Sequence, residues 1–299
     1  NYQLTLSLTG KHYAEALQWL QERLQKDLLF IYNTIVTHIS KTEMGRIHLF
    51  EFEDQKWFPT FLRNYGTDFL QFLSNKTKMY KPIIPIVKKG LSKSKTNQIV
   101  DLGSGGGGGL IWLNSQLKKD IPNLKIILTD FYPNLPAFKF TKGKADNFDY
   151  VEKPIDARNV PEELNGLRTQ FLSLHHFKPK DAELILQNAI DTDSSIAIFE
   201  AQERSVPSIL AMLFSPISVL LVTPLIRPFK FGRIIFTYLI PIVPLFVLWD
   251  GIVSSLRTYS VKEMNKLVKN LKGTETYDWE IYKVKSGPSV VLYLLGTKK

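Results

Sequence analysis

The sequence predicts an α/β fold in which short, mostly parallel strands alternate with helices. Apolar runs of strand length at 98–102, 124–129 and 150–155 each end at or next to an acidic residue, and two further runs follow at 169–174 and 196–199. Helical stretches lie between several of these runs, notably at 110–117 and 181–190. Strands alternating with helices favour parallel pairing with right-handed crossovers. Two final strands, 277–284 and 289–295, flank Ser286-Gly287-Pro288 and predict a closing hairpin.

Three regions of different composition suggest a domain organisation. Apolar residues recur at helical spacing over 11–39 and again after Pro59, and a third short helix is expected from Pro82 to Lys89, stopped by Gly90. We therefore expect a helical amino-terminal cap over 1–90. The α/β core should comprise 91–204 and 252–299, with a final helix at 260–271. An apolar insertion over 205–251 interrupts it.

Composition excludes several kinds of site. The chain has 299 residues and no cysteine, which rules out disulfides, thiolate zinc sites and cysteine nucleophiles. The amino terminus lacks the charged and apolar regions of a signal peptide, so we expect a cytoplasmic protein. The net charge of +10 fits nucleic acid, an anionic membrane surface or simple solubility. No RNA-binding module and no Asn/Asp-Pro-Pro-aromatic motif is visible, so nucleic acid is the least favoured partner.

A strand, a glycine-rich turn and a helix follow one another at 99–117. Glycines allow a tight turn and let a ligand approach the backbone, and the helix offers free N–H groups. The spacing Gly103-x-Gly105-x-x-Gly108, with Asp130 22 residues further on, fits a dinucleotide site. Asp101 at the strand end would instead repel a pyrophosphate, and it suits the ammonium and sulfonium groups of S-adenosylmethionine. The acid therefore favours the methyl donor over NAD.

These motifs together resemble the class I S-adenosylmethionine-dependent methyltransferases. The turn Asp101-Leu-Gly103-Ser-Gly105-Gly-Gly107 looks like their first motif, and the resemblance covers roughly 80–204 and 252–299. It implies a Rossmann-like, seven-stranded methyltransferase sheet that binds S-adenosylmethionine. It also implies that Asp130 binds the ribose hydroxyls and that Asp156 and Ala157 lie beside the adenine. Three segments are similar to a bacterial branch of the family with no defined substrate: Phe171–Phe177, Phe199-Glu200 and Trp249-Asp250-Gly251.

Candidate catalytic residues follow the fourth and fifth predicted strands. The family usually has an acid or an amide in its fourth motif, whereas this chain has Ser173, His175 and His176. A histidine near its ordinary pKa could take a proton from the acceptor, and Glu200 could line the same pocket. His175, His176 and Glu200 could equally have structural roles. No metal site is expected, because adjacent residues of an extended strand point to opposite faces.

A second cluster precedes the helix that follows Pro59. Glu51, Glu53, Asp54 and Trp57 combine acidic and aromatic side chains. They could close over the donor or the acceptor, or they could simply form a solvated helix start.

The insertion is unusual because charges are almost absent from it. Ser205–Ile226 has no charged residue over 22 positions, and Ile234–Trp249 has none over 16. The connector carries Arg227, Lys230 and Arg233, and two full membrane spans would place it outside, against the positive-inside tendency. We therefore expect a hairpin embedded in one leaflet, or a lid over an apolar pocket. A buried part of the core or an oligomer interface is the alternative.

The expected function is methyl transfer from S-adenosylmethionine to a small hydrophobic or lipid-like acceptor, at the inner face of the membrane. A nicotinamide-dependent oxidoreductase is the alternative within enzymes. A non-catalytic, membrane-associated binding protein with a methyltransferase fold is the alternative outside them.

Overall fold

The computed structural model describes Arg23, Lys26, residues 45–287 and residues 289–299. The helix expected over 11–39 lies outside the described residues except for Arg23 and Lys26, which are helical. Residues 46–299 form one compact unit, and the description below concerns that unit alone.

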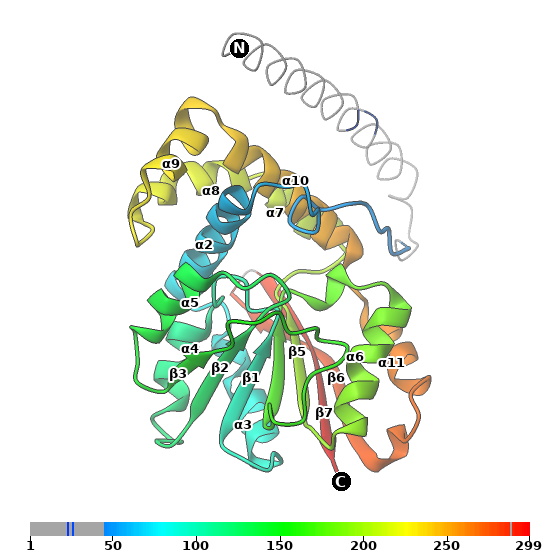
Figure 1. Ribbon diagram of the computed structural model, residues 1–299. Helices are drawn as coiled ribbons and strands as arrows, with labels where there is room; N and C mark the ends of the chain where they lie inside the picture. Colours follow the sequence, from blue (N-terminus) through cyan, green and yellow to red (C-terminus); the bar gives the residue numbers. More distant parts are fainter. Residues whose placement is uncertain (1–22, 24–25, 27–44, 288) are drawn as a thin grey trace, which may run out of the picture. The chain divides into compact units, whose positions relative to one another are not determined.

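A seven-stranded sheet forms its centre, in the order β3-β2-β1-β4-β5-β7-β6 (Figure 1). The first five strands are parallel, and β7 runs antiparallel to both β5 and β6. This order confirms the predicted α/β fold, including the closing hairpin. The strands are β1 (Gln98–Leu102), β2 (Lys125–Thr129), β3 (Phe148–Tyr150), β4 (Leu167–Phe171), β5 (Ile196–Glu200), β6 (Tyr277–Ser286) and β7 (Ser289–Lys298).

Helices cover both faces of the sheet. Ile99 and Val100 are neighbours on β1 but belong to different hydrophobic clusters, because successive strand residues point to opposite faces. The cluster around Ile99 includes buried residues of α3 (Ile84–Ser92), α4 (Leu110–Leu117) and α5 (Leu135–Lys142). The cluster around Val100 includes buried residues of α6 (Pro179–Asp191) and α11 (Val261–Lys269). The result is a three-layer α/β/α sandwich.

The strand expected at 150–155 is displaced in the structure. β3 is an edge strand that pairs only with β2, and it ends at Tyr150. The chain beyond it still follows β2, since Val151 N donates to Leu128 O and Ile155 N donates to Asp130 O. Asp156 therefore lies at the edge of the sheet although it does not end a strand.

The stop expected at Gly90 is also wrong. α3 continues to Ser92, because Gly90 faces the sheet: a Cβ at this position would lie 2.9 Å from Leu167 Cδ1. The glycine permits close packing here and does not end the helix. α3 consequently lies within the core layer, although its residues were expected mainly in the cap.

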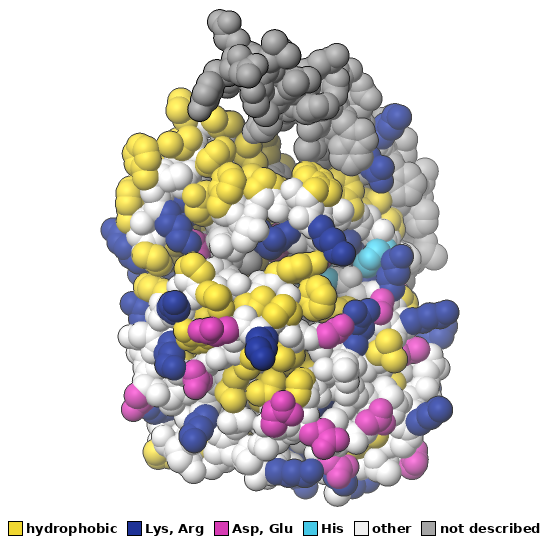
Figure 2. Space-filling model, in the orientation of Figure 1, with side chains coloured by type: hydrophobic (Ala, Val, Ile, Leu, Met, Phe, Trp, Pro, Cys, Tyr) yellow, Lys and Arg dark blue, Asp and Glu magenta, His cyan; other side chains and the backbone are white. Residues whose placement is uncertain are grey.

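The insertion folds into short helices, which are α7 (Val206–Met212), α8 (Ser215–Val222), α9 (Phe231–Ile234) and the first half of α10 (Ile242–Arg257). A π-helical turn at Ile235–Leu239 precedes α10. Many of the hydrophobic side chains of these helices are exposed, and they gather at one end of the molecule (Figure 2). The carboxyl half of α10 is buried and returns the chain to the core.

Residues 46–58 run alongside α10 and are not helical. Arg257 Nε donates to Leu49 O at 2.8 Å, and Trp249 Nε1 donates to Phe50 O at 3.0 Å. The carboxylate of Asp250 accepts the backbone N–H groups of Phe52 and Glu53 at 2.8 and 3.1 Å. The Trp249-Asp250 pair noted in the sequence thus holds this segment in place.

Candidate active site

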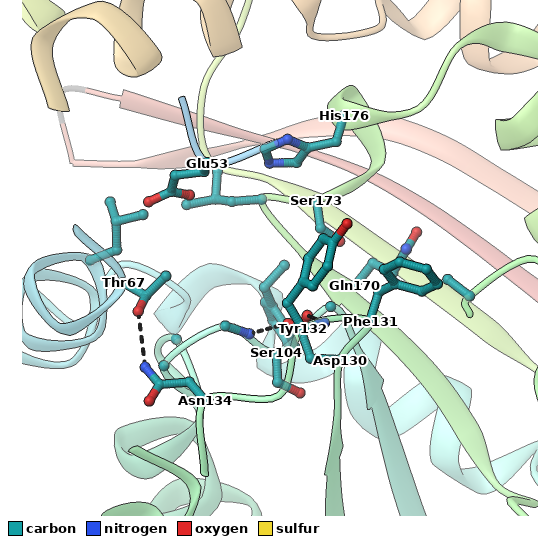
Figure 3. A pocket seen from close by; sticks show the side chains of 18 of the residues that line it. Glu53, Thr67, Ser104, Asp130, Phe131, Tyr132, Asn134, Gln170, Ser173 and His176 are labelled. Carbon is teal, nitrogen blue, oxygen red and sulfur yellow. Dashed lines mark hydrogen bonds between the residues drawn. The ribbon is translucent and has the colours of Figure 1, made fainter. Parts of the chain in front are cut away.

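A cavity of about 350 Å³ opens at the carboxyl ends of the parallel strands. Open α/β sheets bind their ligands at this edge, and the volume lies within the usual range for small-molecule sites. The walls come from the glycine turn, the segments after β2 and β3, the end of β4, α2 (Thr60–Lys76) and the 46–58 segment. Figure 3 shows Asp130 and Asn134 on one side, with Glu53 and His176 on the side away from them.

The glycine turn has a defined conformation. Ser104 anchors it to β2, since its backbone N donates to Thr129 O at 2.9 Å and its Oγ accepts from Thr129 N at 3.1 Å. The turn uses the left-handed backbone region, which favours glycine. Positive φ angles occur at Gly103, Gly105, Gly107 and Gly108.

Two amide side chains of α2 hold this turn from outside. Gln71 Nε2 donates to Gly106 O and, at 2.9 Å, to Thr141 Oγ1. Asn75 Nδ2 donates to Gly108 O at 2.7 Å, and its Oδ1 accepts from Trp112 N at 2.7 Å. The two residues are four positions apart and therefore share one helix face. α2 thus fixes the glycine turn directly.

Gly106 is needed because α2 comes so close. A Cβ at this position would lie 2.8 Å from the carbonyl oxygen of Thr67, a backbone atom that cannot swing away. We expect Gly106→Ala to lower the free energy of unfolding by about 1–3 kcal/mol through overpacking, as measured by urea denaturation. Gly143→Ala is the matched control, since its Cβ would meet only ordinary contacts at 3.5 Å. Equal stability of the two variants would contradict this account of the turn.

Asp130 links the turn to the cavity. Its Oδ2 accepts from Gly105 N and its Oδ1 from Tyr132 N, both at 2.7 Å (Figure 3). Burial raises the pKa of this carboxyl, although the backbone hydrogen bonds act in the opposite direction. Thr67 Oγ1 accepts from Asn134 Nδ2 at 3.3 Å and closes the wall between α2 and the segment after β2.

Gln170 on β4 has an unpaired side-chain amide in the cavity wall. The side chain is fully buried and lines the cavity, yet its Oε1 and Nε2 have no hydrogen-bond partner among the described residues. Buried polar atoms are nearly always paired in folded proteins. A ligand with both a donor and an acceptor at this end of the cavity would satisfy the amide.

Most of the expected cofactor residues border the cavity, but two do not. Gly103, Gly105, Asp130, Asp156 and Ala157 all line it. Asp156 is also paired with Arg158 at 2.7 Å, which lowers the pKa of the aspartate.

Asp101 and Gly107 lie behind the cavity wall. The carboxyl of Asp101 is buried and accepts from Thr169 Oγ1 at 2.7 Å. Burial raises its pKa to about 7 despite that hydrogen bond. The expected direct contact of Asp101 with the ammonium group of the donor is therefore not formed by this conformation.

His176 lines the cavity within a network of charges. Its Nδ1 lies 2.8 Å from Asp54 Oδ1 and 3.2 Å from Glu51 Oε2. Burial opposes a charged ring, but the attraction of Glu51 and Asp54 outweighs it and raises the pKa of His176 to about 10. The expectation of a histidine base near its ordinary pKa therefore does not hold for His176, which stays cationic at neutral pH.

The same network includes an arginine. Arg257 Nη1 lies 3.1 Å from Glu51 Oε1 and 2.6 Å from Asp54 Oδ2. Glu51, His175 and His176 also have the spacing of a three-residue metal site, with ligand atoms within 4.8 Å of one another. Arg257, which pairs with Glu51, already balances the charge of one of these three residues. We therefore interpret the cluster as a charge-paired network.

His175 and Glu200 form a buried pair away from the cavity lining. Glu200 accepts from the backbone N of His175 at 3.1 Å, and its other oxygen lies 2.9 Å from His175 Nδ1. Both side chains are almost fully buried. Neither side chain lines the cavity in this conformation, so the geometry does not support the catalytic roles expected for them. The pair holds the turn Leu174–His176 that presents His176.

Glu53 is the carboxyl group that the sequence only partly indicated. It lines the cavity, and its backbone is held by Asp250 at the N–H and by Arg63 Nε at the carbonyl, the latter at 2.9 Å. Burial and the charges of Glu51 and Asp54 raise its pKa to about 7, against the opposing effect of His176 and Arg63. Glu53 can therefore change its protonation state near neutral pH.

The α2 residues of the wall carried no signal in the sequence. Asn64 and Thr67 line the cavity, and Gln71 and Asn75 hold the glycine turn from outside it. All four lie on a helix whose sequence pattern showed only its apolar face. Their spacing of three and four positions was the available clue to a shared polar face. Nothing local indicates that this face meets the glycine turn.

No family model and no curated protein matches the sequence. Solved structures similar to this chain include the plantazolicin methyltransferase BpumL in complex with SAH, with a TM-score of 0.46 and 14% identity over 80% of this chain and 88% of that one. PigF with SAH has a TM-score of 0.47 and 18% identity over 82% and 63%. An O-methyltransferase family protein from Burkholderia thailandensis has a TM-score of 0.43 and 15% identity over 76% and 58%. A shared fold at such identities does not transfer a function.

Proposed function

We propose that this protein is an S-adenosylmethionine-dependent methyltransferase that acts on a small, hydrophobic acceptor. The observation that carries the proposal is the cavity at the carboxyl edge of the sheet, where the glycine turn and Asp130 meet. The strand order and the motifs at 101–107, 130 and 156–157 support it together.

The residues of the cavity fit such a cofactor. The free backbone of the glycine turn suits close approach of a ligand, and Asp130 offers carboxylate oxygens to ribose hydroxyls. Asp156 and Ala157 offer a polar and a small side chain for an adenine. The unpaired amide of Gln170 offers one donor and one acceptor inside the same wall.

The bound cofactor would supply a methyl group on a positively charged sulfur. The protein's task is then to hold the acceptor in line with that methyl group, and such positioning accounts for much of the rate in two-substrate reactions. Glu53 is the group able to take a proton from an acceptor O–H or N–H at neutral pH. In its carboxylate form Glu53 would take the proton that the acceptor gives up when the methyl–sulfur bond breaks and the methyl group passes to the acceptor.

Calorimetry provides the test. S-adenosylmethionine and S-adenosylhomocysteine should bind, and NAD should not. Asp130→Ala should weaken binding by about 1–3 kcal/mol, because a charge-assisted hydrogen bond is lost. Asp149→Ala, which removes an exposed carboxyl outside the cavity, is the control. Binding of NAD in place of S-adenosylmethionine would favour the oxidoreductase alternative, and unchanged affinity in Asp130→Ala would refute the ribose assignment.

A further inference from the structure

The insertion carries most of the exposed large hydrophobic side chains of the described residues. Fourteen of the twenty lie between Val206 and Leu245, among them Leu221 at 70% and Leu239 at 77% exposure. Figure 2 shows them gathered over one end of the molecule, with lysine and arginine side chains along the border. A monomer in water rarely leaves so large an apolar surface uncovered, because exposing apolar side chains to water is unfavourable.

Two features of the insertion favour a lipid surface as the cover. Its 45 residues from Ser205 to Trp249 contain no acidic side chain, although they contain Arg227, Lys230 and Arg233. The stretch Val206–Leu225 is apolar enough to enter a membrane, with a mean hydropathy of 2.1, and only 17% of it is buried in the protein. A core helix would be mostly buried, and residue 206 is far from any amino-terminal signal.

The insertion cannot cross the bilayer, because its second half is tied to the enzyme. Arg233 Nη1 donates to Asp68 Oδ2 of α2 at 2.6 Å, and Trp249 and Asp250 of α10 hold the 46–58 segment. The segment Phe231–Leu239 also meets α10 at a bend of 78°. A bilayer that meets this apolar surface would therefore hold it in the interface, as it holds monotopic proteins, and would not be spanned by it.

Two of the three cations of the connector are paired with a carboxylate in the structure. Arg233 is 1% exposed and pairs with Asp68. Lys230 pairs with the same carboxylate at 2.7 Å. Arg227 is exposed, and its hydrogen bonds to described residues go to the carbonyl groups of Pro224 and Ile226. The surface consequently depends on apolar side chains more than on charge.

We propose that the apolar face of residues 206–245 docks this protein onto an anionic lipid bilayer without spanning it. This proposal does not depend on the methyltransferase assignment. If both hold, the bilayer would be the source of a lipophilic acceptor.

The absence of cysteine allows a direct test. Leu221→Cys and Leu239→Cys, each labelled with an environment-sensitive dye, should show a blue shift with vesicles of phosphatidylcholine and phosphatidylglycerol. Nitroxide groups on the lipid chains should quench the dye. Leu184→Cys on α6 is the matched control, because Leu184 is 52% exposed but lies outside the insertion, and its dye should not respond.

A second variant separates the two proposals. Leu221→Asp should reduce co-sedimentation with these vesicles at least tenfold and leave S-adenosylmethionine affinity unchanged. If the unmodified protein binds vesicles but does not bind S-adenosylmethionine, the proposed function is overturned and the membrane proposal is kept. If vesicles cause no blue shift and the nitroxide lipids cause no quenching in labelled Leu221→Cys or Leu239→Cys, the membrane proposal is overturned. A vesicle-independent dimer would then identify a second copy as the cover, and a monomer with shielded dyes would identify this chain's own remaining residues.

Discussion

Glu53→Gln should lower the rate of methyl transfer about 10²–10⁴-fold, the usual contribution of a positioned general base. The glutamine keeps the size and the backbone contacts of Glu53 but cannot accept a proton. S-adenosylmethionine affinity should therefore remain unchanged. The rate is measured as S-adenosylhomocysteine release with a membrane lipid extract as the source of acceptor. Glu152→Gln is the control, because Glu152 is exposed and lies outside the cavity.

The rate of methyl transfer should also depend on pH in a defined direction. Glu53 has a pKa of about 7, so its carboxylate form increases as the pH rises through 7, and the rate should rise with it. The charged groups around it are Glu51 and Asp54 on its own segment, His176, Arg63 of α2 and Asp250 of α10. His176 stays cationic below its pKa of about 10 and so does not contribute to the rise.

Infrared spectroscopy can follow the same group without substrate. Glu53 and Asp101 both have a pKa of about 7, so the carboxylic C=O absorption that titrates near pH 7 should lose the contribution of Glu53, and keep that of Asp101, in Glu53→Gln. A full rate in Glu53→Gln would rule out Glu53 as the base. A rate that falls as the pH rises through 7 would contradict the direction proposed here.

Asp68→Ala should be the most destabilising of the substitutions considered, at about 3–5 kcal/mol. Asp68 is 5% exposed and accepts from both Arg233 and Lys230. Its removal leaves the buried guanidinium of Arg233 without a counter-charge. Urea denaturation measures the loss, and the midpoint should move to lower urea concentration.

Two further variants test the cause of that loss. Lys230→Gln should cost less than about 1 kcal/mol, because Lys230 is partly exposed and can be replaced by water. Asp68→Leu combined with Arg233→Met should recover most of the stability, since apolar residues can replace a buried ion pair. A large loss in Lys230→Gln, or no recovery in the double variant, would show that the pair is not what joins α2 to the insertion.

The local parts of the fold were predictable because local sequence determines them. β1 and α4 have the expected bounds, and β2 and β5 differ from expectation by one residue. An apolar run, a cluster of glycines and the acid that follows are read over a few residues, and the sheet places them together at one edge. β3 was less predictable, because a three-residue edge strand has little pattern of its own.

The candidate site divides in the same way. Sequence patterns were enough to expect the glycine turn, Asp130 and the pair Asp156-Ala157 near one another. The first two follow strand ends, and the pair follows a segment that continues along β2. Which carboxyl groups titrate near neutral pH depends instead on tertiary contacts, which raise the pKa of Glu53 and of Asp101 to about 7. Asp54 is 122 positions from His176 and 203 from Arg257, and the pKa values in this cluster depend on those long-range contacts.

In the insertion too, the burial of side chains could not be predicted from the sequence. Composition alone identified 205–251 as apolar, but it could not separate buried from exposed side chains, because the pattern is apolar on every face. Contacts with α2 and with the 46–58 segment determine which of these side chains are buried. They bury Arg233 and the carboxyl half of α10, and they leave the face from Val206 to Leu245 exposed. Burial is a property of the neighbours that a side chain meets, and those neighbours come from distant parts of the chain.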